Sequence, residues 1–480
     1  MTASLFLASA TVDPAWINTL LVILMFATFV VLLFTGYPVA FLLGGVGVLF
    51  TGICVLSDAC FDTDTGMDFR TLGLIVNRTF KLMENGILVA LPMFIFMGLM
   101  LDRSGIAERL MNATQSIVGR VHGGLALTVT VIGVLLAAST GIIGASVVLL
   151  GLLSIRPMLN QGYAKELAVG VVCSSGTLGI LIPPSIMLVV MADQLADQAV
   201  SVGDLFMGAV FPGLILAGLY AGYIIIYGLI RPEAAPVSPA SEPFSIRLVG
   251  RLLWAVVPPA LLIVVVLGSI FMGIATPTEA SGMGALGAML LAAANRKLSV
   301  KVVRTVSQES LRTTAFILAI LIGASCFALV LRSLGGDELV ERSLSSLPFS
   351  PYVVLLIILG IVFLLGFVLD WIEITMIILP LVAPVVSGLA FNLNDYDGAL
   401  TNPAVIWFAI LVAVTLQTSF LTPPVGFALF YVKGVCPPEI KISHLYRGVV
   451  PFVILQLIGL AILIIWPQIV TWLPAAAYGK

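Results

Sequence analysis

Apolar residues occur in long blocks along this chain of 480 residues, and short polar stretches separate the blocks. A helix needs about 20 apolar residues to cross a bilayer, and ten of the blocks suit one crossing each. The block at 86–101 is short, so we expect it to tilt or to extend into its flanks. The ten predicted spans cover residues 16–36, 37–56, 86–101, 166–192, 205–230, 252–274, 277–294, 313–331, 404–432 and 448–472.

Two further apolar blocks, 125–155 and 352–386, are too long for one crossing and too short for two. The first has Ser139, Thr140 and Gly141 at its middle, and the second has Asp370, Trp371 and Glu373 there. We interpret each block as a re-entrant hairpin of two half-helices. The alternative is one long tilted span, which would place both acids of the second block deep in a continuous helix.

The composition agrees with these blocks. The chain is 60% hydrophobic and 10% charged, against about 45–50% and 25% in soluble domains, so we predict an all-α polytopic membrane protein. A net charge of -2 gives no basic footprint for nucleic acid. The five Cys and two His form no ligand-spaced cluster for zinc, and no G-x-x-x-x-G-K-[ST] motif for ATP is present. We therefore expect no cofactor and no enzyme activity.

The basic residues indicate which loops lie in the cytoplasm. If the two hairpins do not cross, the loops alternate sides, and one side then holds 16 of the 22 Lys and Arg. The positive-inside rule makes that side cytoplasmic. The prediction is a multi-pass protein of a bacterial inner membrane with both termini in the periplasm.

The two halves of the chain resemble each other at a nearly constant offset. Pro38 matches Pro277, "LDRSG" at 101–105 weakly matches "LRSLG" at 331–335, "LIPPS" at 181–185 matches "LTPPV" at 421–425, and Pro212 matches Pro451. Five spans plus one hairpin per half predict an inverted repeat, as in many secondary transporters. The predicted parts are a tail at 1–15, a first repeat at 16–231, a linker at 232–251, a second repeat at 252–474 and a tail at 475–480.

Both Pro-Pro pairs interrupt a predicted span. Pro183 and Pro184 have no N–H for the carbonyls of Gly179 and Ile180, and Pro423 and Pro424 likewise free the carbonyls of Ser419 and Phe420. Hydroxyl oxygens lie close by in sequence, at Ser174, Ser175, Thr177, Thr415, Thr418 and Thr422. Sites with only oxygen ligands suit a hard cation such as Na⁺. The alternative is a proline kink that Ser and Thr satisfy within the helix, and the duplication favours a binding site.

Three acids lie in or at the mouth of apolar blocks. Asp370 and Glu373 at the second hairpin tip are intramembrane acids, which are functional candidates by default. We rank Asp370 first, because Glu373 could lie on a wet face of the hairpin. Glu279 opens the predicted span at 277–294, where an acid at a helix start is equally well explained by the helix dipole.

These motifs resemble the large membrane subunit of TRAP (tripartite ATP-independent periplasmic) transporters. "GTLGILIPPSIML", "GIATPTEASGMGAL", "LLGFVLD" and "FLTPPVGFALF" carry the resemblance, which runs from about Trp16 to Trp472. The resemblance implies an elevator-type, Na⁺-coupled importer of organic acid anions with scaffold and transport domains. It also implies two partners, a small four-helix membrane subunit and a soluble periplasmic substrate-binding protein, and no ATPase.

The resemblance further implies the site residues. Ion-binding residues would be Ser139, Thr140, Gly141, Ser175, Gly176, Thr177, Gly366, Asp370, Thr418, Ser419 and Thr422. The residues that bind the substrate or form the helix breaks would be Pro183, Pro184, Ser185, Pro423, Pro424, Trp371 and Glu373. This chain departs from the family where Thr415 and Ser419 replace Asn and Gly, and where Trp371 follows Asp370. The bulk of Trp371 and the subgroup resemblance favour a monocarboxylate or 2-oxo acid over a C4-dicarboxylate.

Three other functions are open to the sequence. The chain could be a stand-alone Na⁺- or H⁺-coupled carboxylate carrier without a binding protein. It could be the permease of an ATP-driven importer, or an intramembrane enzyme, although its two His residues lie near loops.

Overall fold

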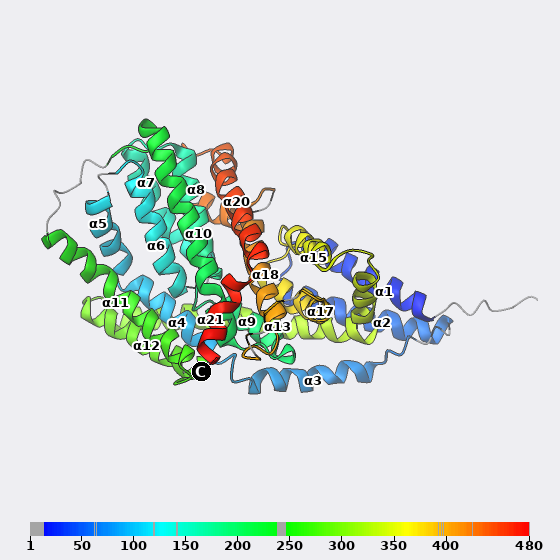
Figure 1. Ribbon diagram of the computed structural model, residues 1–480. Coiled ribbons are helices and arrows are strands. Elements are labelled where there is room, and N and C mark those ends of the chain that lie inside the picture. Colours follow the sequence, from blue (N-terminus) through cyan, green and yellow to red (C-terminus); the bar gives the residue numbers. More distant parts are fainter. Residues whose placement is uncertain are drawn as a thin grey trace, which may run out of the picture. The chain divides into compact units, whose positions relative to one another are not determined.

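The computed structural model describes residues 14–61, 63, 65–118, 121–140, 143–237, 246–391, 393–394, 396, 398–424 and 426–479, without the side chains of 14–15, 61, 112, 115–118, 137–140, 246–249 and 251–252. All regular secondary structure in these ranges is helical, as the apolar blocks predict (Figure 1). Nine of the described helices or helical segments are long and apolar enough to cross a membrane. The chain forms two compact units: unit 1 runs up to Asn85 and includes Phe316–Pro348, and unit 2 contains Gly86–Ala315 and Phe349–Lys480.

Unit 1 packs helices from both halves of the chain against each other. Its helices are α1 (Pro14–Leu33), α2 (Val39–Phe61), α3 (Phe69–Glu84), the C-terminal half of α13 (Val300–Ser333) and α14 (Gly336–Ser345). A Cβ at Gly323 would lie 2.3 Å from the carbonyl oxygen of Ala40, so α2 and α13 approach closely through this glycine. The buried ring of Phe29 packs on Phe327, with 5.3 Å between the ring centroids.

Two helices differ from the predicted spans. Helix α3 lies in the predicted loop after 37–56, and none of its residues is buried. Its apolar residues alternate with Arg70, Arg78 and Lys81, which is the pattern of a helix that lies at a membrane surface. Helix α13 begins at Val300 rather than at 313, because the basic segment and the apolar block that follows it form one continuous helix.

Unit 2 contains the remaining elements, and Figure 1 shows α6, α7, α8 and α10 as long, roughly parallel helices. The helices that precede the linker are α4 (Ala90–Arg103), α5 (Ile106–Val118), α6 (Gly124–Thr140), α7 (Ile143–Asn160), α8 (Lys165–Thr177), η1 (Leu178–Ile180), α9 (Ile186–Gln194), η2 (Ala196–Gln198), α10 (Val202–Ile230) and η3 (Pro232–Ala234). Those that follow it are α11 (Ile246–Phe271), α12 (Pro277–Ala294), α15 (Pro351–Leu365), α16 (Trp371–Glu373), η4 (Ile374–Ile378), α17 (Leu379–Gly388), α18 (Pro403–Leu421), α19 (Phe427–Val435), α20 (Ile442–Ile465) and α21 (Gln468–Tyr478).

The apolar block at 125–155 forms the two helices α6 and α7, whose outer ends lie together. Leu125 at the start of α6 donates a backbone hydrogen bond to the Tyr163 hydroxyl beyond the end of α7 (3.1 Å). The flanking residues Gly123 and Ala164 both donate to the same short segment, to the carbonyls of Ala235 and Ala234 (2.9 Å each). The two ends of this segment therefore lie close together, as they do in a hairpin.

The block at 352–386 has the same geometry. Its first arm is α15, and its second arm is formed by α16, η4 and α17. The ring of Tyr352 at the start of the first arm packs on Phe391, just beyond the second arm, with 5.6 Å between centroids. Both blocks therefore return to where they begin.

Residues matched between the two halves have the same local structure. Gly36 and Gly273 have positive φ (79° and 67°), and so do Gly105 and Gly335 (73° and 76°). Pro212 and Pro451 lie inside α10 and α20. These paired features support the predicted repeat.

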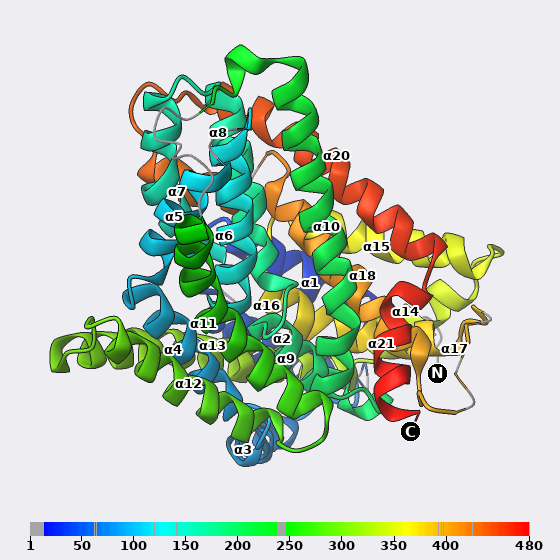
Figure 2. The same ribbon diagram turned by 60° about the vertical axis from the view of Figure 1, so that its left-hand side comes forward.

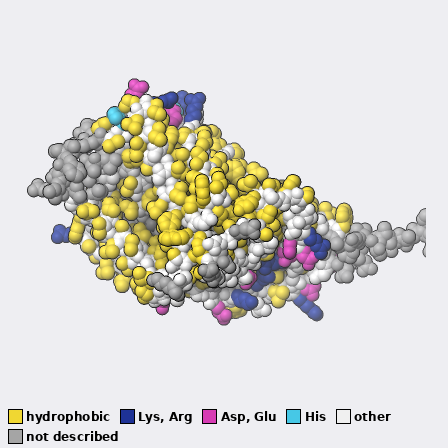
Figure 3. Space-filling model, viewed as in Figure 1, with side chains coloured by type: hydrophobic (Ala, Val, Ile, Leu, Met, Phe, Trp, Pro, Cys, Tyr) yellow, Lys and Arg dark blue, Asp and Glu magenta, His cyan; other side chains and the backbone are white. Residues whose placement is uncertain are grey.

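Hydrophobic side chains dominate the face of unit 2 in the space-filling view, and some Lys and Arg side chains are visible at its upper edge (Figure 3). The core of unit 2 is formed by both hairpins and both interrupted helices. Helix α18 is nearly all buried, from Val405 to Leu421. An apolar surface with charges at its ends is what a bilayer requires.

Candidate functional site

The two interrupted helices pack crosswise with the two hairpins in unit 2. Helices α6 and α7 pack on α8, while α15 and α17 pack on α18. Beyond the Pro-Pro breaks the partners are exchanged: α9 packs on α16, η4 and α17 of the second hairpin, and α19 packs on α7 of the first. We call these elements, α6–α9 and α15–α19, the central cluster. It brings both breaks and the second hairpin tip into one region, seen from a second direction in Figure 2.

Each break contains a short segment that is not α-helical, and this segment is nearly all buried at the first break, whereas at the second break Thr422 and Pro423 are half-buried and Pro424 is exposed. Helix α8 ends at Thr177, continues as the 3₁₀ turn η1, and α9 begins after Ser185. Helix α18 ends at Leu421, and α19 begins after Gly426, whose φ is +53°. A broken helix exposes backbone polar groups that must find partners inside the protein or in a ligand.

The structure corrects the prediction for two of the four carbonyls. The Ser185 hydroxyl donates to the carbonyl of Ile180 (2.6 Å), and the Thr422 N–H donates to the carbonyl of Ser419 (3.1 Å). The protein itself therefore satisfies these two oxygens. The carbonyls of Gly179 and Phe420 accept no hydrogen bond from any described residue, and both residues are buried.

The hydroxyls of the predicted ion site donate their protons inside the protein. Thr418 donates to the carbonyl of Val414, and Thr422 donates to that of Thr418 (2.8 and 2.7 Å). The same holds for Ser419 to Leu416 (2.8 Å), Thr177 to Ser174 (2.9 Å) and Ser175 to the Thr130 hydroxyl (3.3 Å). A hydroxyl whose proton is used in this way keeps a lone pair for a further partner. These oxygens can therefore face a cation.

Glycines allow close contact between the hairpins and the interrupted helices. A Cβ at Gly366 would lie 2.2 Å from Oγ of Ser419, and a Cβ at Gly176 would lie 2.4 Å from Cγ2 of Val147. On the first hairpin, a Cβ at Gly133 would lie 2.6 Å from Cβ of Ser175. In both halves a glycine of the first hairpin arm thus lies against a serine of the interrupted helix.

The second hairpin tip holds two acids in different environments. Asp370 is half-buried and caps α16 by accepting a hydrogen bond from the N–H of Trp371 (2.8 Å). Glu373 is only 2% exposed, and its Oε2 has no hydrogen-bond partner among the described residues. The expectation that Glu373 lies on a wet face is therefore wrong. The next segment, η4, is a π-helix, a local widening found often at functional sites.

Tyr431 on α19 lies against the first hairpin. Its ring contacts Gly144 at the start of α7, because a Cβ there would lie 3.0 Å from the ring. Ser139 and Thr140 end α6 in the first hairpin, but their side chains and Gly141 lie outside the described residues.

A buried polar cluster that the sequence did not indicate connects the two interrupted helices. Gln417 Nε2 on α18 donates to the hydroxyls of Thr177 (3.5 Å) and Tyr220 (3.3 Å), and Gln456 Nε2 on α20 donates to Tyr220 (2.8 Å). Tyr220 and both Gln side chains are fully buried. The available signal was spacing: Gln417 follows Thr177 by 240 residues, as Pro423 follows Pro183.

Two other observations limit the chemistry of the region. Glu279 forms a capping box with Thr276 at the start of α12, which agrees with the dipole interpretation. In the described ranges, no three His, Cys, Asp or Glu side chains lie close enough to hold a metal ion. The polar groups described at the two breaks and at the second hairpin tip are hydroxyls, carbonyls, amides and the two tip acids.

Similar proteins are large membrane subunits of one transporter class. The chain is 30% identical over 95% of its length to the C4-dicarboxylate TRAP transporter large permease protein DctM of Vibrio cholerae, covering 98% of that protein. It is 28% identical to the isethionate TRAP transporter permease protein DctMQ of Oleidesulfovibrio alaskensis, over 90% of this chain and 65% of that protein. It is 26% identical to the sialic acid TRAP transporter large permease protein SiaM of Vibrio cholerae, over 93% and 97%.

Solved structures of two membrane transporters share the fold. The YdaH transporter of Alcanivorax borkumensis superposes with a TM-score of 0.55 at 14% identity, over 80% of this chain and 85% of that one. MtrF of Neisseria gonorrhoeae gives 0.51 at 15% identity, over 82% and 84%.

The comparisons decide between the functions that the sequence left open. The family whose model matches residues 26–469 is described as the tripartite ATP-independent periplasmic transporter, DctM component. The ATP-driven permease, the stand-alone carrier and the intramembrane enzyme are therefore wrong. The family works with a small membrane subunit and a periplasmic binding protein. The chain belongs to the DctM family of large membrane subunits of TRAP transporters.

Proposed function

We propose that this subunit imports a small organic acid anion across the bacterial inner membrane and couples that import to a Na⁺ gradient. The observation that carries the proposal is the pair of matched helix breaks in the central cluster. Each break combines a carbonyl that no described residue satisfies with hydroxyls that have already donated their protons. Such oxygen ligands suit Na⁺, which is cargo here rather than a resident cofactor.

The predicted ion ligands divide between the breaks and the hairpin tips. At the first break they are Ser175, Gly176 and Thr177, with Ser139, Thr140 and Gly141 of the facing hairpin. At the second break they are Thr418, Ser419 and Thr422, with Gly366 and Asp370. The close contact between Gly366 and Ser419 supports the second group, because it holds hairpin and interrupted helix at one place.

The substrate anion is proposed to bind beside the second hairpin tip. Helix α16 begins there, and half-helix N-termini favour anionic groups in transporters of this architecture. Trp371 is 6% exposed and fills space at the tip, which favours a monocarboxylate or 2-oxo acid over a dicarboxylate. The relatives named above carry a C4-dicarboxylate, isethionate and sialic acid, and all three are organic acids.

Alternating access is proposed to move the central cluster past a scaffold. The scaffold would consist of the spans at 16–56, 205–230, 252–294 and 448–472. Such motion of one bundle against another around a fixed site is common among transporters with inverted repeats.

Uptake by proteoliposomes tests the coupling. The vesicles carry this subunit with its small membrane subunit, and receive the loaded binding protein with an inward Na⁺ gradient or with choline in its place. We expect uptake only with Na⁺, and equal uptake in choline would contradict the proposal.

A matched pair of variants tests the ion ligands. Thr418→Val removes a proposed ligand, and we expect it to raise the Na⁺ concentration for half-maximal uptake about tenfold, ~1.4 kcal/mol. Thr313→Val is the control, because Thr313 makes the same hydrogen bond to its own helix (3.0 Å to the carbonyl of Glu309) outside the central cluster. Equal effects of the two changes would exclude Thr418 as a ligand.

A further inference from the structure

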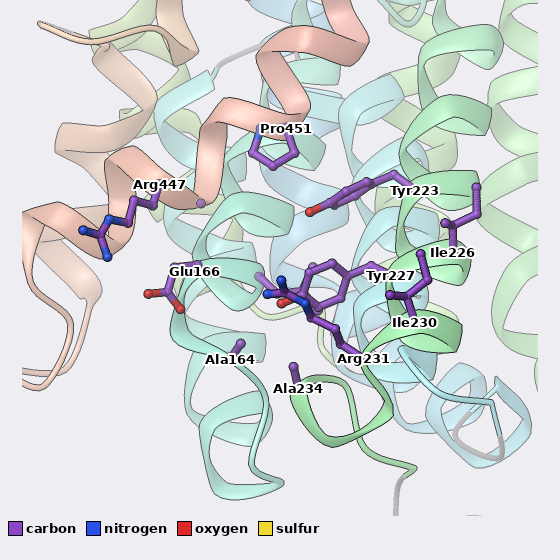
Figure 4. A pocket seen from close by; sticks show the side chains of 12 residues that line it. Ala164, Glu166, Tyr223, Ile226, Tyr227, Ile230, Arg231, Ala234, Arg447 and Pro451 are labelled. Carbon is purple, nitrogen blue, oxygen red and sulfur yellow. The ribbon is translucent and has the colours of Figure 1, made fainter.

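A cavity of about 670 Å³ lies in unit 2 between the N-terminal ends of α8 and α20 and the C-terminal end of α10. It is separate from the central cluster breaks, since its wall is formed by the outer ends of these helices. Figure 4 shows Tyr223 and Tyr227 projecting from α10 into it, with Glu166 of α8 on the opposite side. Arg231 and Arg447 complete its polar wall.

Among the described residues, neither arginine forms an ion pair or a hydrogen bond. The Arg231 guanidinium lies 6.0 Å from the centre of the Tyr227 ring. Glu166 is the one acid among the described residues that line the cavity, and it already lies 3.9 Å from His444. Two unpaired guanidinium groups against one partly paired carboxylate leave the wall with an excess of positive charge.

The rest of the wall is apolar and faces outward. Ile226 and Ile230 line the cavity and are 58% and 72% exposed, as residues that contact lipid tails would be. The apolar sequence of α10 ends at Ile230 and is followed by Arg231, Pro232 and Glu233. The cavity thus lies where a predicted span meets the basic side, at the depth of lipid headgroups. Tyrosine is enriched at this depth because its ring is apolar and its hydroxyl is polar.

We propose that this cavity binds the headgroup of an anionic phospholipid, with the phosphodiester on Arg231 and Arg447 and an acyl chain along Ile226 and Ile230. Arginine binds phosphate oxygens through paired N–H donors. Basic pockets between membrane helices on the cytoplasmic side suit anionic lipid headgroups. The proposal rests on the membrane location of the chain and not on its substrate or ion.

Lipid retention by the full-length protein tests the proposal. The purified protein is incubated with phosphatidylcholine vesicles that contain phosphatidylglycerol, phosphatidylethanolamine or neither, and the lipid that stays bound after repurification is measured by native mass spectrometry. We expect phosphatidylglycerol to be retained in preference to phosphatidylethanolamine. The double change Arg231→Gln and Arg447→Gln should reduce this retention about tenfold, since each lost hydrogen bond involves a charged group. Replacing both residues by Lys keeps the positive charge but loses the paired N–H donors, so retention should fall between that of the wild type and that of the double Gln variant.

Two single variants test whether the anionic lipid binds in this cavity. Arg304→Gln removes an exposed arginine of α13 that lies on the same predicted cytoplasmic side of the membrane. This change should leave the retention of phosphatidylglycerol unchanged. Glu166→Gln removes the one acid of the wall, and it should increase the retention of phosphatidylglycerol. A thermal unfolding curve for each variant shows whether it is folded, and retention is compared only among folded variants.

Several outcomes would overturn the proposal. Equal losses in Arg304→Gln and the double variant would mean a general charge effect. Preference for phosphatidylethanolamine, with loss in Glu166→Gln, would assign the cavity to a lipid that carries an ammonium group. Displacement of bound lipid by millimolar inorganic phosphate would indicate a site for free phosphate.

Discussion

At the residue scale, Gly366 is a position of the central cluster that has no room for a larger side chain. A methyl group there would lie 2.2 Å from Oγ and 2.9 Å from Cβ of Ser419, which is fully buried. We expect Gly366→Ala to destabilise the protein by about 1–3 kcal/mol, as overpacking does in well-packed cores, and to abolish uptake. Thermal unfolding in detergent and proteoliposome uptake measure the two effects.

Gly360 provides the matched control on the same helix. A Cβ there would meet no atom within 4 Å, so Gly360→Ala should be neutral or slightly stabilising, because alanine favours helix. If Gly360→Ala and Gly366→Ala unfold at the same temperature, hairpin and interrupted helix do not meet at Ser419.

A second prediction at the residue scale concerns Glu279. Its carboxylate accepts hydrogen bonds from the N–H and hydroxyl of Thr276 (2.8 and 2.9 Å). Glutamine can form the same capping box, so we expect Glu279→Gln to unfold like the wild type and Glu279→Ala to unfold at a lower temperature. Both variants should keep the wild-type Na⁺ dependence of uptake, and a changed dependence in Glu279→Gln would instead indicate a role in ion binding.

At the scale of elements, the hydroxyl of Tyr220 joins helices α10, α18 and α20. It accepts hydrogen bonds from Gln417 and Gln456, all three side chains being fully buried. Tyr220→Phe leaves two buried amide N–H groups without this acceptor, at a cost of about 1–3 kcal/mol. The double variant Tyr220→Phe with Gln456→Leu should therefore lose less stability than the sum of the single changes.

Tyr223→Phe is the control for these single and double variants. Tyr223 lies about one turn further along α10, and its hydroxyl forms no hydrogen bond to a described residue. Equal destabilisation by Tyr220→Phe and Tyr223→Phe would show that the buried hydrogen bonds contribute nothing to the packing of these helices. Chemical denaturation of the purified protein supplies the free energies.

The comparison of elements shows what hydropathy can and cannot predict. The span at 277–294 has the bounds of α12, Pro277–Ala294, because an apolar block with Pro at its start marks a helix directly. Helix α3 was missed, because a surface helix has too many polar residues for a span. The helix break predicted at Pro183 and Pro184 is confirmed. The hydrogen bond from the Ser185 hydroxyl to the carbonyl of Ile180 was not predicted, because it depends on how the chain folds within the break.

The sequence predicts which types of residue form the candidate site, but it predicts few of the contacts between them. Hydroxyls and prolines at matched positions are visible in the sequence. The burial of Glu373 is not, because one acid in an apolar block looks the same whether its side chain faces water or protein. The Gln417 cluster depends on contacts between residues some 200 positions apart, which one sequence without relatives does not reveal.

At the scale of the whole molecule, the hairpins determine the side on which each loop lies. The backbone N–H groups of Gly123 and Ala164 bind neighbouring carbonyls, so the two ends of the first hairpin must lie on one side of the membrane. With the excess of basic residues, that side is predicted to be cytoplasmic and the C-terminus periplasmic. A crossing segment would instead put the two ends on opposite sides.

Labelling of single cysteines with a membrane-impermeant maleimide tests this topology. The background carries Cys60→Ser and Cys436→Ser, because the other three cysteines are buried. We expect Val121→Cys and Asn160→Cys to react only after the cells are permeabilised, since both lie at the hairpin ends, and Tyr478→Cys to react in intact cells. Reaction of only one of the two hairpin-end cysteines in intact cells would show that α6 and α7 cross the membrane as one segment. Such a result would also remove the basis for the inverted repeat, because the first half would then contain six crossings, and an even number does not invert the half that follows.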